Sequence, residues 1–112
     1  MEDKKFTDFA ELGALIPSVP PESILSRTFY QDSEVRAILF SFAPGQELSQ
    51  HTASVPAIMQ FLEGEAKIKL GDQEMTVHPG AWIHMTAKLP HSILAVTPVK
   101  MLLLMLFCEA GE

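Results

Sequence analysis

Two histidines, His51 and His91, are the residues of this chain whose types and spacing could do chemistry. His51 lies in the stretch Gly45–Gly64, which contains no other histidine, and His91 lies forty residues further on. Imidazole is a common ligand of transition metals, and it also gains and loses a proton near neutral pH. The pair therefore indicates a metal site, an acid–base site or a ligand pocket with hydrogen-bonding walls.

Short strands are the elements that would position these histidines. Strand patterns occur at residues 24–30, 35–42, 57–62, 66–70, 74–77, 82–85, 91–96 and 100–107. They recur roughly every 8–12 residues and are separated by turn residues, which favours a sandwich or barrel over alternating strands and helices. The sequence therefore predicts an all-β domain over residues 23–112.

A different pattern precedes the strands. Phe6, Phe9, Leu12 and Leu15 recur at helical spacing, and a proline at position 17 ends the pattern. We expect a short helix over Phe6–Ile16, which together with a proline-rich connector occupies residues 1–22.

Composition limits the partners of the protein. The chain has 112 residues and a net charge of −6. Nucleic acids and anionic membranes attract basic surfaces, so we expect neither as a partner, whereas a small anion held by a local cation is compatible with this charge. The N-terminus lacks a signal-peptide pattern, and the longest apolar run is too short for a membrane helix, so a cytoplasmic location is expected. The single cysteine, Cys108, allows no internal disulfide and is expected to be a small buried residue.

The segment Met101–Phe107 is apolar at every position. A strand that is buried on one face alternates between apolar and polar residues, so this strand should be covered on both faces. The barrel core would cover one face, and the N-terminal helix or a second subunit would cover the other. We therefore predict a homodimer.

Two segments carry a family resemblance. Their patterns are Gly45-x5-His51-x-Ala53-x3-Ala57-x6-Gly64 and Gly80-x5-Thr86-x-Lys88-x2-His91-x3-Ala95. These spacings resemble the two signature motifs of the cupin superfamily, G-x5-H-x-H-x3,4-E-x6-G and G-x5-P-x-G-x2-H-x3-N. The resemblance covers residues 24–107 and implies a jelly-roll barrel, commonly a homodimer, whose motif histidines project into the mouth.

The chain departs from these motifs at two of the four usual metal ligands. Ala53 replaces the second histidine and Ala57 replaces the glutamate. If the strand face that carries Trp82 and His84 points inward, His84 could complete a three-histidine set with His51 and His91. The cofactor would then be one divalent transition metal (Zn, Fe, Ni or Mn); the other interpretation is that none is bound.

Three functions stay open at this point. The two alanines should enlarge the pocket, which Met59, Phe61 and Trp82 would also line, so the first is binding of a small organic molecule with an apolar body. The second is a metal-dependent enzyme of the dioxygenase or isomerase type. The third is a structural or regulatory dimer that does not use its pocket.

Overall fold

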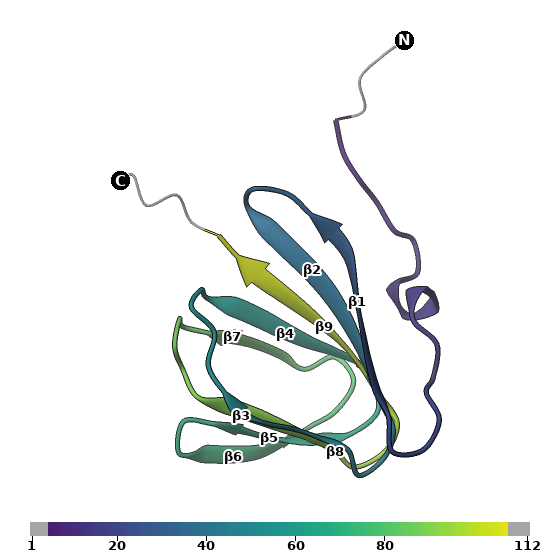
Figure 1. Cartoon of the computed structure of the whole chain (residues 1–112), viewed down its shortest axis with the longest axis vertical. Coiled ribbons are helices and arrows are strands. Elements are labelled where there is room, and N and C mark those ends of the chain that lie inside the picture. Colours follow the sequence, from purple (N-terminus) through teal and green to yellow (C-terminus); the bar gives the residue numbers. More distant parts are fainter. Residues whose placement is uncertain (1–4, 108–112) are drawn as a thin grey trace.

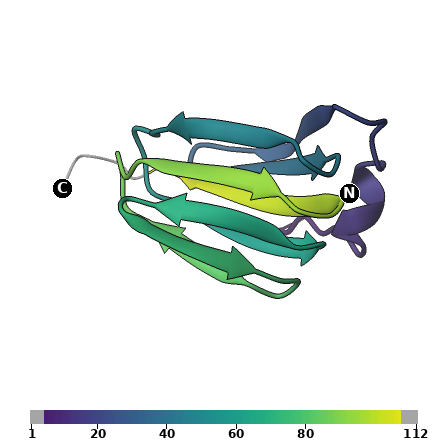
Figure 2. The same cartoon turned by 90° about the horizontal axis from the view of Figure 1, so that it is seen from below.

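Nine β-strands form two antiparallel sheets in the computed structural model, which describes residues 5–107 (Figure 1). The strands are β1 (Ile24–Gln31), β2 (Val35–Phe42), β3 (Glu47–His51), β4 (Ala57–Glu63), β5 (Ala66–Leu70), β6 (Gln73–Val77), β7 (Trp82–Met85), β8 (His91–Ala95) and β9 (Val99–Leu106). The five-stranded sheet has the order β1-β2-β9-β4-β7, and the four-stranded sheet has the order β3-β8-β5-β6 (Figure 2). The predicted all-β jelly-roll architecture is confirmed.

The sequence located eight of these nine strands, with ends that differ by no more than one residue. It missed β3, Glu47–His51, whose sequence Glu-Leu-Ser-Gln-His is mostly polar. β3 is an edge strand that pairs only with β8, and the pairing is irregular between Leu48 and His51. Only one of its side chains, Leu48, packs against the core, so β3 has no alternating pattern to recognise. His51 is therefore the last residue of a strand.

The predicted helix over Phe6–Ile16 is wrong. Within the described residues this segment contains a single 3-10 turn, η1 (Leu12–Leu15). Glu11, which precedes the turn, has an extended backbone and forms no side-chain cap, and Ile16 is extended again. Without a capped first turn, a segment this short does not form a stable helix on its own. The apolar spacing instead reflects contacts with the sheet.

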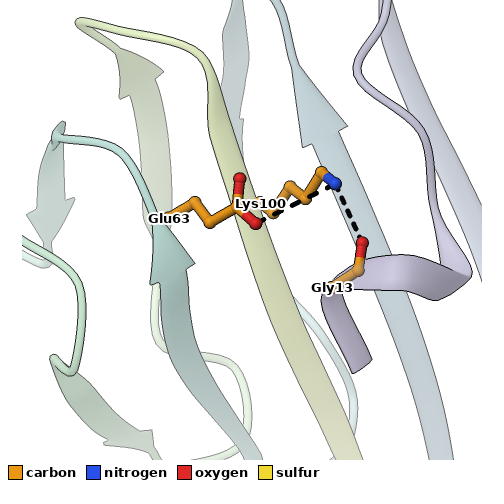
Figure 3. Close-up of polar contacts among 3 residues, drawn as sticks. All are labelled: Gly13, Glu63 and Lys100. Carbon is orange, nitrogen blue, oxygen red and sulfur yellow. Dashed lines mark hydrogen bonds and ion pairs between the residues drawn. The ribbon is translucent and has the colours of Figure 1, made fainter. Parts of the chain in front are cut away.

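The N-terminal segment covers the outer face of the five-stranded sheet. Ile16 forms a buried cluster there with Leu39 of β2 and Leu102 of β9. Two cations fix the segment. The Lys100 Nζ donates to the Gly13 carbonyl at 2.8 Å (Figure 3), and the Arg27 Nη1 donates to the Leu15 carbonyl at 2.7 Å. The Nζ of Lys100 also lies 3.9 Å from a carboxylate oxygen of Glu63.

The apolar strand β9 is thus covered on both faces, as the sequence predicted. The barrel core covers one face and the N-terminal segment covers the other. The homodimer stays a prediction.

Cys108 lies outside the described residues. Between residues 5 and 107, no helical segment has the length and hydrophobicity that crossing a membrane requires.

Strand alternation builds the core between the sheets. Along β4 the side chains of Ala57, Met59 and Phe61 are buried, and those between them are half-buried on the opposite face. The buried set packs against Ile68 of β5 and Ile93 of β8 in the four-stranded sheet. This alternation identifies the inner face of every strand that is paired in register with β4.

Gly64 ends β4 at a close approach between two backbone segments. Its φ is +86°, and a Cβ at this position would lie 1.9 Å from the carbonyl oxygen of Pro98. Gly45 has a similar φ of +82°, but a Cβ there would meet nothing within 4 Å. The two glycines of the first motif therefore serve different purposes: Gly45 supplies a turn, and Gly64 also provides space.

We expect Gly64→Ala to destabilise the protein much more than Gly45→Ala. Both variants impose a left-handed backbone on alanine, which costs about 1–2 kcal/mol. Only Gly64→Ala also forces two backbone segments apart, so its total loss should exceed about 3 kcal/mol. Urea unfolding of the two variants and the wild type measures both losses, and equal losses would contradict the role of the close approach.

Candidate functional site

Two connections cross between the sheets at the same end of the molecule. β3 ends at His51 and β4 begins at Ala57, while β7 ends at Met85 and β8 begins at His91. Each connection therefore leads from one sheet to the other. Figure 1 shows the two sheets diverging toward this end. We call this end of the barrel the mouth.

Cross-strand pairing identifies the side chains on the two walls of the mouth. On the wall formed by the four-stranded sheet, the register pairs His51 with His91 and His91 with Leu70. The wall formed by the five-stranded sheet carries, in strand order, Arg36, Met105, Ala57 and Met85. Directly paired residues point to the same face of a sheet. Because Ala57 and Met85 belong to the core, the whole row lies on the inner face.

His51 and His91 lie side by side. Their ring centroids are 4.2 Å apart and the ring planes make an angle of 60°. His91 is 6% exposed, and it shares its strand face with the buried Ile93. His51, at the end of the edge strand, is exposed. The pair therefore joins the interior of the barrel to the solvent at the mouth.

Both imidazole rings are held by backbone carbonyls. The Nδ1 of His51 lies 2.8 Å from the Ser49 carbonyl oxygen, and the Nδ1 of His91 lies 2.9 Å from that of Leu89. A carbonyl oxygen only accepts hydrogen bonds, so in each neutral ring the proton is assigned to Nδ1. Each Nε2 then keeps its lone pair, so the site holds two oriented acceptors side by side.

The environment of His91 lowers its pKa below the ordinary value of 6.5. Burial is the largest cause, because it penalises the charged imidazolium. The hydrogen bond to the Leu89 carbonyl acts in the opposite direction, and a positive charge on His51 would lower the pKa further. His91 is therefore neutral at pH 7.

Trp82 and His84 lie on the outer face of the five-stranded sheet and do not line the mouth. The register pairs Trp82 with Gln60 and His84 with Ile58, whose side chains lie opposite those of Ala57 and Met59 on β4. Trp82 is 59% exposed and His84 is exposed. The structure therefore does not form the three-histidine set with His84. The inner residues of β7 are instead Ile83 and Met85.

The other residues expected in the pocket occupy different positions. Met59 and Phe61 are 1% and 0% exposed and belong to the packed core below the mouth. Ala53 lies in the connection after β3, where its carbonyl accepts a hydrogen bond at 2.7 Å from the backbone N–H of Lys88. Lys88 has a φ of +70°, which is strained for a residue with a side chain. This bond joins the two connections that form the rim of the mouth.

The residues of the mouth do not fit a divalent-metal centre with three or four protein ligands. Over the described range 5–107, no three His, Cys, Asp or Glu side chains are grouped to hold a metal ion. The donors present are the two Nε2 atoms of His51 and His91, because Ala53 and Ala57 have no coordinating atom. Protein sites for divalent transition metals usually supply at least three ligands.

A surface hollow of about 480 Å³ lies away from the mouth, on the outer face of the four-stranded sheet. Its charged side chains are Glu47, Lys67, Lys69 and Glu74. All but the half-buried Lys69 are exposed, and both signs of charge are present in equal number, which is usual for a solvated sheet face. The mouth is therefore the better candidate site, because it combines a buried titratable group with oriented acceptors.

The prediction from sequence missed four residues on the walls of the mouth: Arg36, Leu70, Met85 and Met105. Alternation over residues 35–42 could have placed Arg36 on the same face as Phe40 and Phe42. No sequence pattern, however, shows that Arg36 shares a row with Ala57, since that depends on the register of three strands.

This fold and this mouth are those of a cupin barrel. The family model described as "Cupin domain" matches residues 38–107, which is more than half of the chain, so the chain belongs to the cupin family. The family resemblance inferred from the motif spacing is thereby confirmed.

Solved structures agree with this assignment. A cupin superfamily protein from Desulfitobacterium hafniense is 30% identical in sequence and has a TM-score of 0.80. The similar region covers 87% of this chain and 88% of that protein. A conserved protein of unknown function from Streptococcus pyogenes is 28% identical and has a TM-score of 0.81, over 97% of this chain and 95% of that protein. A cupin 2 conserved barrel domain protein from Leptotrichia buccalis is 24% identical and has a TM-score of 0.78, over 85% of this chain and 46% of that protein. No curated protein matches the chain.

We expect the stability of the protein to fall as the pH drops below about 6.5. In the unfolded chain His91 takes up a proton near that pH, whereas in the folded chain it does so only at lower pH, because its pKa is lowered. The loss should develop between the folded and unfolded pKa values and stay constant at lower pH. His91→Gln should remove this component from urea unfolding curves measured at several pH values.

An NMR titration of the histidine rings checks the same point directly. His51→Ala should raise the pKa of His91 only slightly, since burial is the larger cause of its shift. The control variant His84→Gln, on the outer face, should leave the titration of His91 unchanged. A midpoint for His91 at or above the ordinary histidine value of 6.5 would contradict the assignment.

Proposed function

We propose that this cupin binds a small organic molecule at the mouth of its barrel, with His51 and His91 as the polar anchors and no resident metal. The observation that carries this proposal is the pair of adjacent imidazoles, each fixed through Nδ1 by a backbone carbonyl. Fixed orientation lowers the entropic cost of binding, because the acceptors do not have to be ordered when the ligand arrives.

The opposite wall of the mouth supports a ligand with an apolar body. Met105 and Ala57 lie next to each other on this wall, and a methionine adapts its shape to irregular partners. A hydroxyl or N–H group of the ligand would donate to one or both Nε2 atoms. Because His91 is neutral at pH 7, it could also accept the proton of an acidic hydroxyl.

A second candidate function, a metal-dependent enzyme of the dioxygenase or isomerase type, draws on the same two lone pairs. Two imidazoles with free Nε2 atoms are a partial ligand set for a transition metal. The missing ligands would have to be water or substrate, because the described part of the chain groups no third His, Cys, Asp or Glu with the pair. Such a centre would bind its metal weakly, which makes the two functions separable by metal analysis.

The predicted homodimer is proposed alongside this function. On the outer face of the five-stranded sheet, Trp82 is 59% exposed, and Ile58 and Leu104 in the adjacent row are half-buried. Large apolar side chains in such a position are typical of surfaces that contact another protein. A second copy packed there would leave the mouth open.

We expect small polar fragments to bind to the wild type and to lose binding in His51→Ala. A ligand-observed NMR screen with a fragment library tests this, and ring signals of His51 and His91 report the site. His51 is exposed, so its removal should not disturb folding. His84→Ala is the matched control, because it removes an exposed imidazole on the other side of the sheet and should bind fragments as the wild type does.

Elemental analysis of the same three proteins separates the two candidate functions. The proposed binding protein should contain far less than one metal ion per chain after a chelator wash, with no difference between the variants. Stoichiometric metal in the wild type and in His84→Ala, but not in His51→Ala, would replace our proposal by the metal-dependent enzyme.

A further inference from the structure

Arg36 places a positive charge on the inner face of the mouth. β2 pairs with β9 without irregularity, so Arg36 points to the same side as Phe40 and Phe42, which pack on the inner core. Its partner in the register, Met105, is in turn paired with Ala57. Arg36 therefore stands two strands from Ala57, about 10 Å along the wall that faces the histidines.

The guanidinium group of Arg36 has no carboxylate partner within the described residues. Its Nε and Nη2 both lie 3.4 Å from the Thr28 Oγ1, which is long for a hydrogen bond. Asp32, in the same hairpin, accepts hydrogen bonds from the Tyr30 hydroxyl and from the backbone N–H groups of Glu34 and Val35. The Asp32 carboxylate thus stabilises the β1–β2 turn and leaves Arg36 available.

The rim of the mouth carries a second cation. Lys88 lies in the connection between β7 and β8, is exposed, and keeps its strained φ of +70°. Backbone strain that persists at the edge of a candidate site is consistent with a functional role for the residue. Neither Arg36 nor Lys88 pairs with a carboxylate of another residue in the range 5–107.

We propose that the ligand of this mouth is a small organic acid, and that Arg36 binds its carboxylate. The inference depends on the proposed function, because it assigns a ligand class to the same site. A guanidinium fork pairs with a carboxylate through two parallel hydrogen bonds, and an ammonium group does not reproduce this geometry. The weak contacts to the Thr28 hydroxyl are easily exchanged for these stronger ones.

The two walls define the shape of the acid. Its carboxylate lies at Arg36, its apolar body lies over Met105 and Ala57, and a hydroxyl or N–H group donates to an Nε2 of His51 or His91. The acidic and the donor groups must therefore stand at opposite ends of an apolar spacer. A hydroxy acid with a rigid spacer, such as 4-hydroxyphenylacetate, has this form.

Matched pairs of acids and their primary amides test the proposal. The probes are 4-hydroxyphenylacetate, 4-hydroxybenzoate and 5-hydroxypentanoate, each with its amide, added to the wild type and observed through the ring signals of His51 and His91. We expect at least one acid to bind at least about tenfold more tightly than its amide, the range for a charge-assisted pair.

Three variants locate the charge that is responsible. Arg36→Gln should weaken the acid to the level of its amide, and Arg36→Lys should restore only part of the preference because it lacks the fork. Lys67→Gln removes another exposed cation, from the outer face of the four-stranded sheet, and should change affinity less than about twofold.

The possible contrary results can be distinguished from one another, because each contradicts a different part of the proposal. If acids and amides bind equally well at the histidines, the acid preference is wrong while the proposed function stands. If no probe and no fragment shifts the histidine signals, the proposed function fails and the inference fails with it. If Arg36→Gln alters the sedimentation coefficient but not the preference, Arg36 belongs to a subunit contact and the inference is overturned.

Discussion

From Met101 to Leu106 the strand β9 is apolar on both faces, and much of the structure follows from the need to cover it. Burial of a leucine side chain stabilises a fold by about 2 kcal/mol, so neither face of such a strand can be left in water. On the inner face Met101 packs into the core, and on the outer face Leu102 packs against Ile16. The central place of β9 between β2 and β4 also fixes the registers that bring Arg36, Met105 and Ala57 into one row.

Sequence patterns were sufficient to predict a strand where burial alone determined which of its residues are apolar. The inner strands alternate or are continuously apolar, so their positions could be predicted, and the motif spacing correctly placed His51 beside His91. β3 was missed because an exposed edge strand needs no apolar face. The N-terminal helix was predicted from apolar spacing that an irregular segment can satisfy equally well when it lies against a sheet.

The orientation of β7 shows why the remaining part of the site could not be predicted. Alternation correctly separates Trp82 and His84 from Ile83 and Met85, but it does not tell which pair faces inward. In a short strand the hydrophobicity of tryptophan competes with that of isoleucine and methionine. The register with β4 decides the matter, because Met85 is paired with Ala57 and Ile83 with Met59. The predicted pocket with Trp82 and His84 assumed that this face points inward, whereas the packing of the whole sheet places Ile83 and Met85 inside.

Alanine at position 57 changes the electrostatics of the mouth as well as its metal chemistry. The signature motif that this segment resembles has a glutamate here, whose negative charge would oppose both a carboxylate ligand and a neutral imidazole pair. With a methyl group instead, the described residues beside Arg36 in this row, Met105, Ala57 and Met85, carry no negative charge, and the lowered pKa of His91 keeps its ring neutral. The absence of a carboxylate at position 57 and the presence of a guanidinium on the same wall therefore act in the same direction. In the proposed function, an anion on this wall meets no repulsion from position 57.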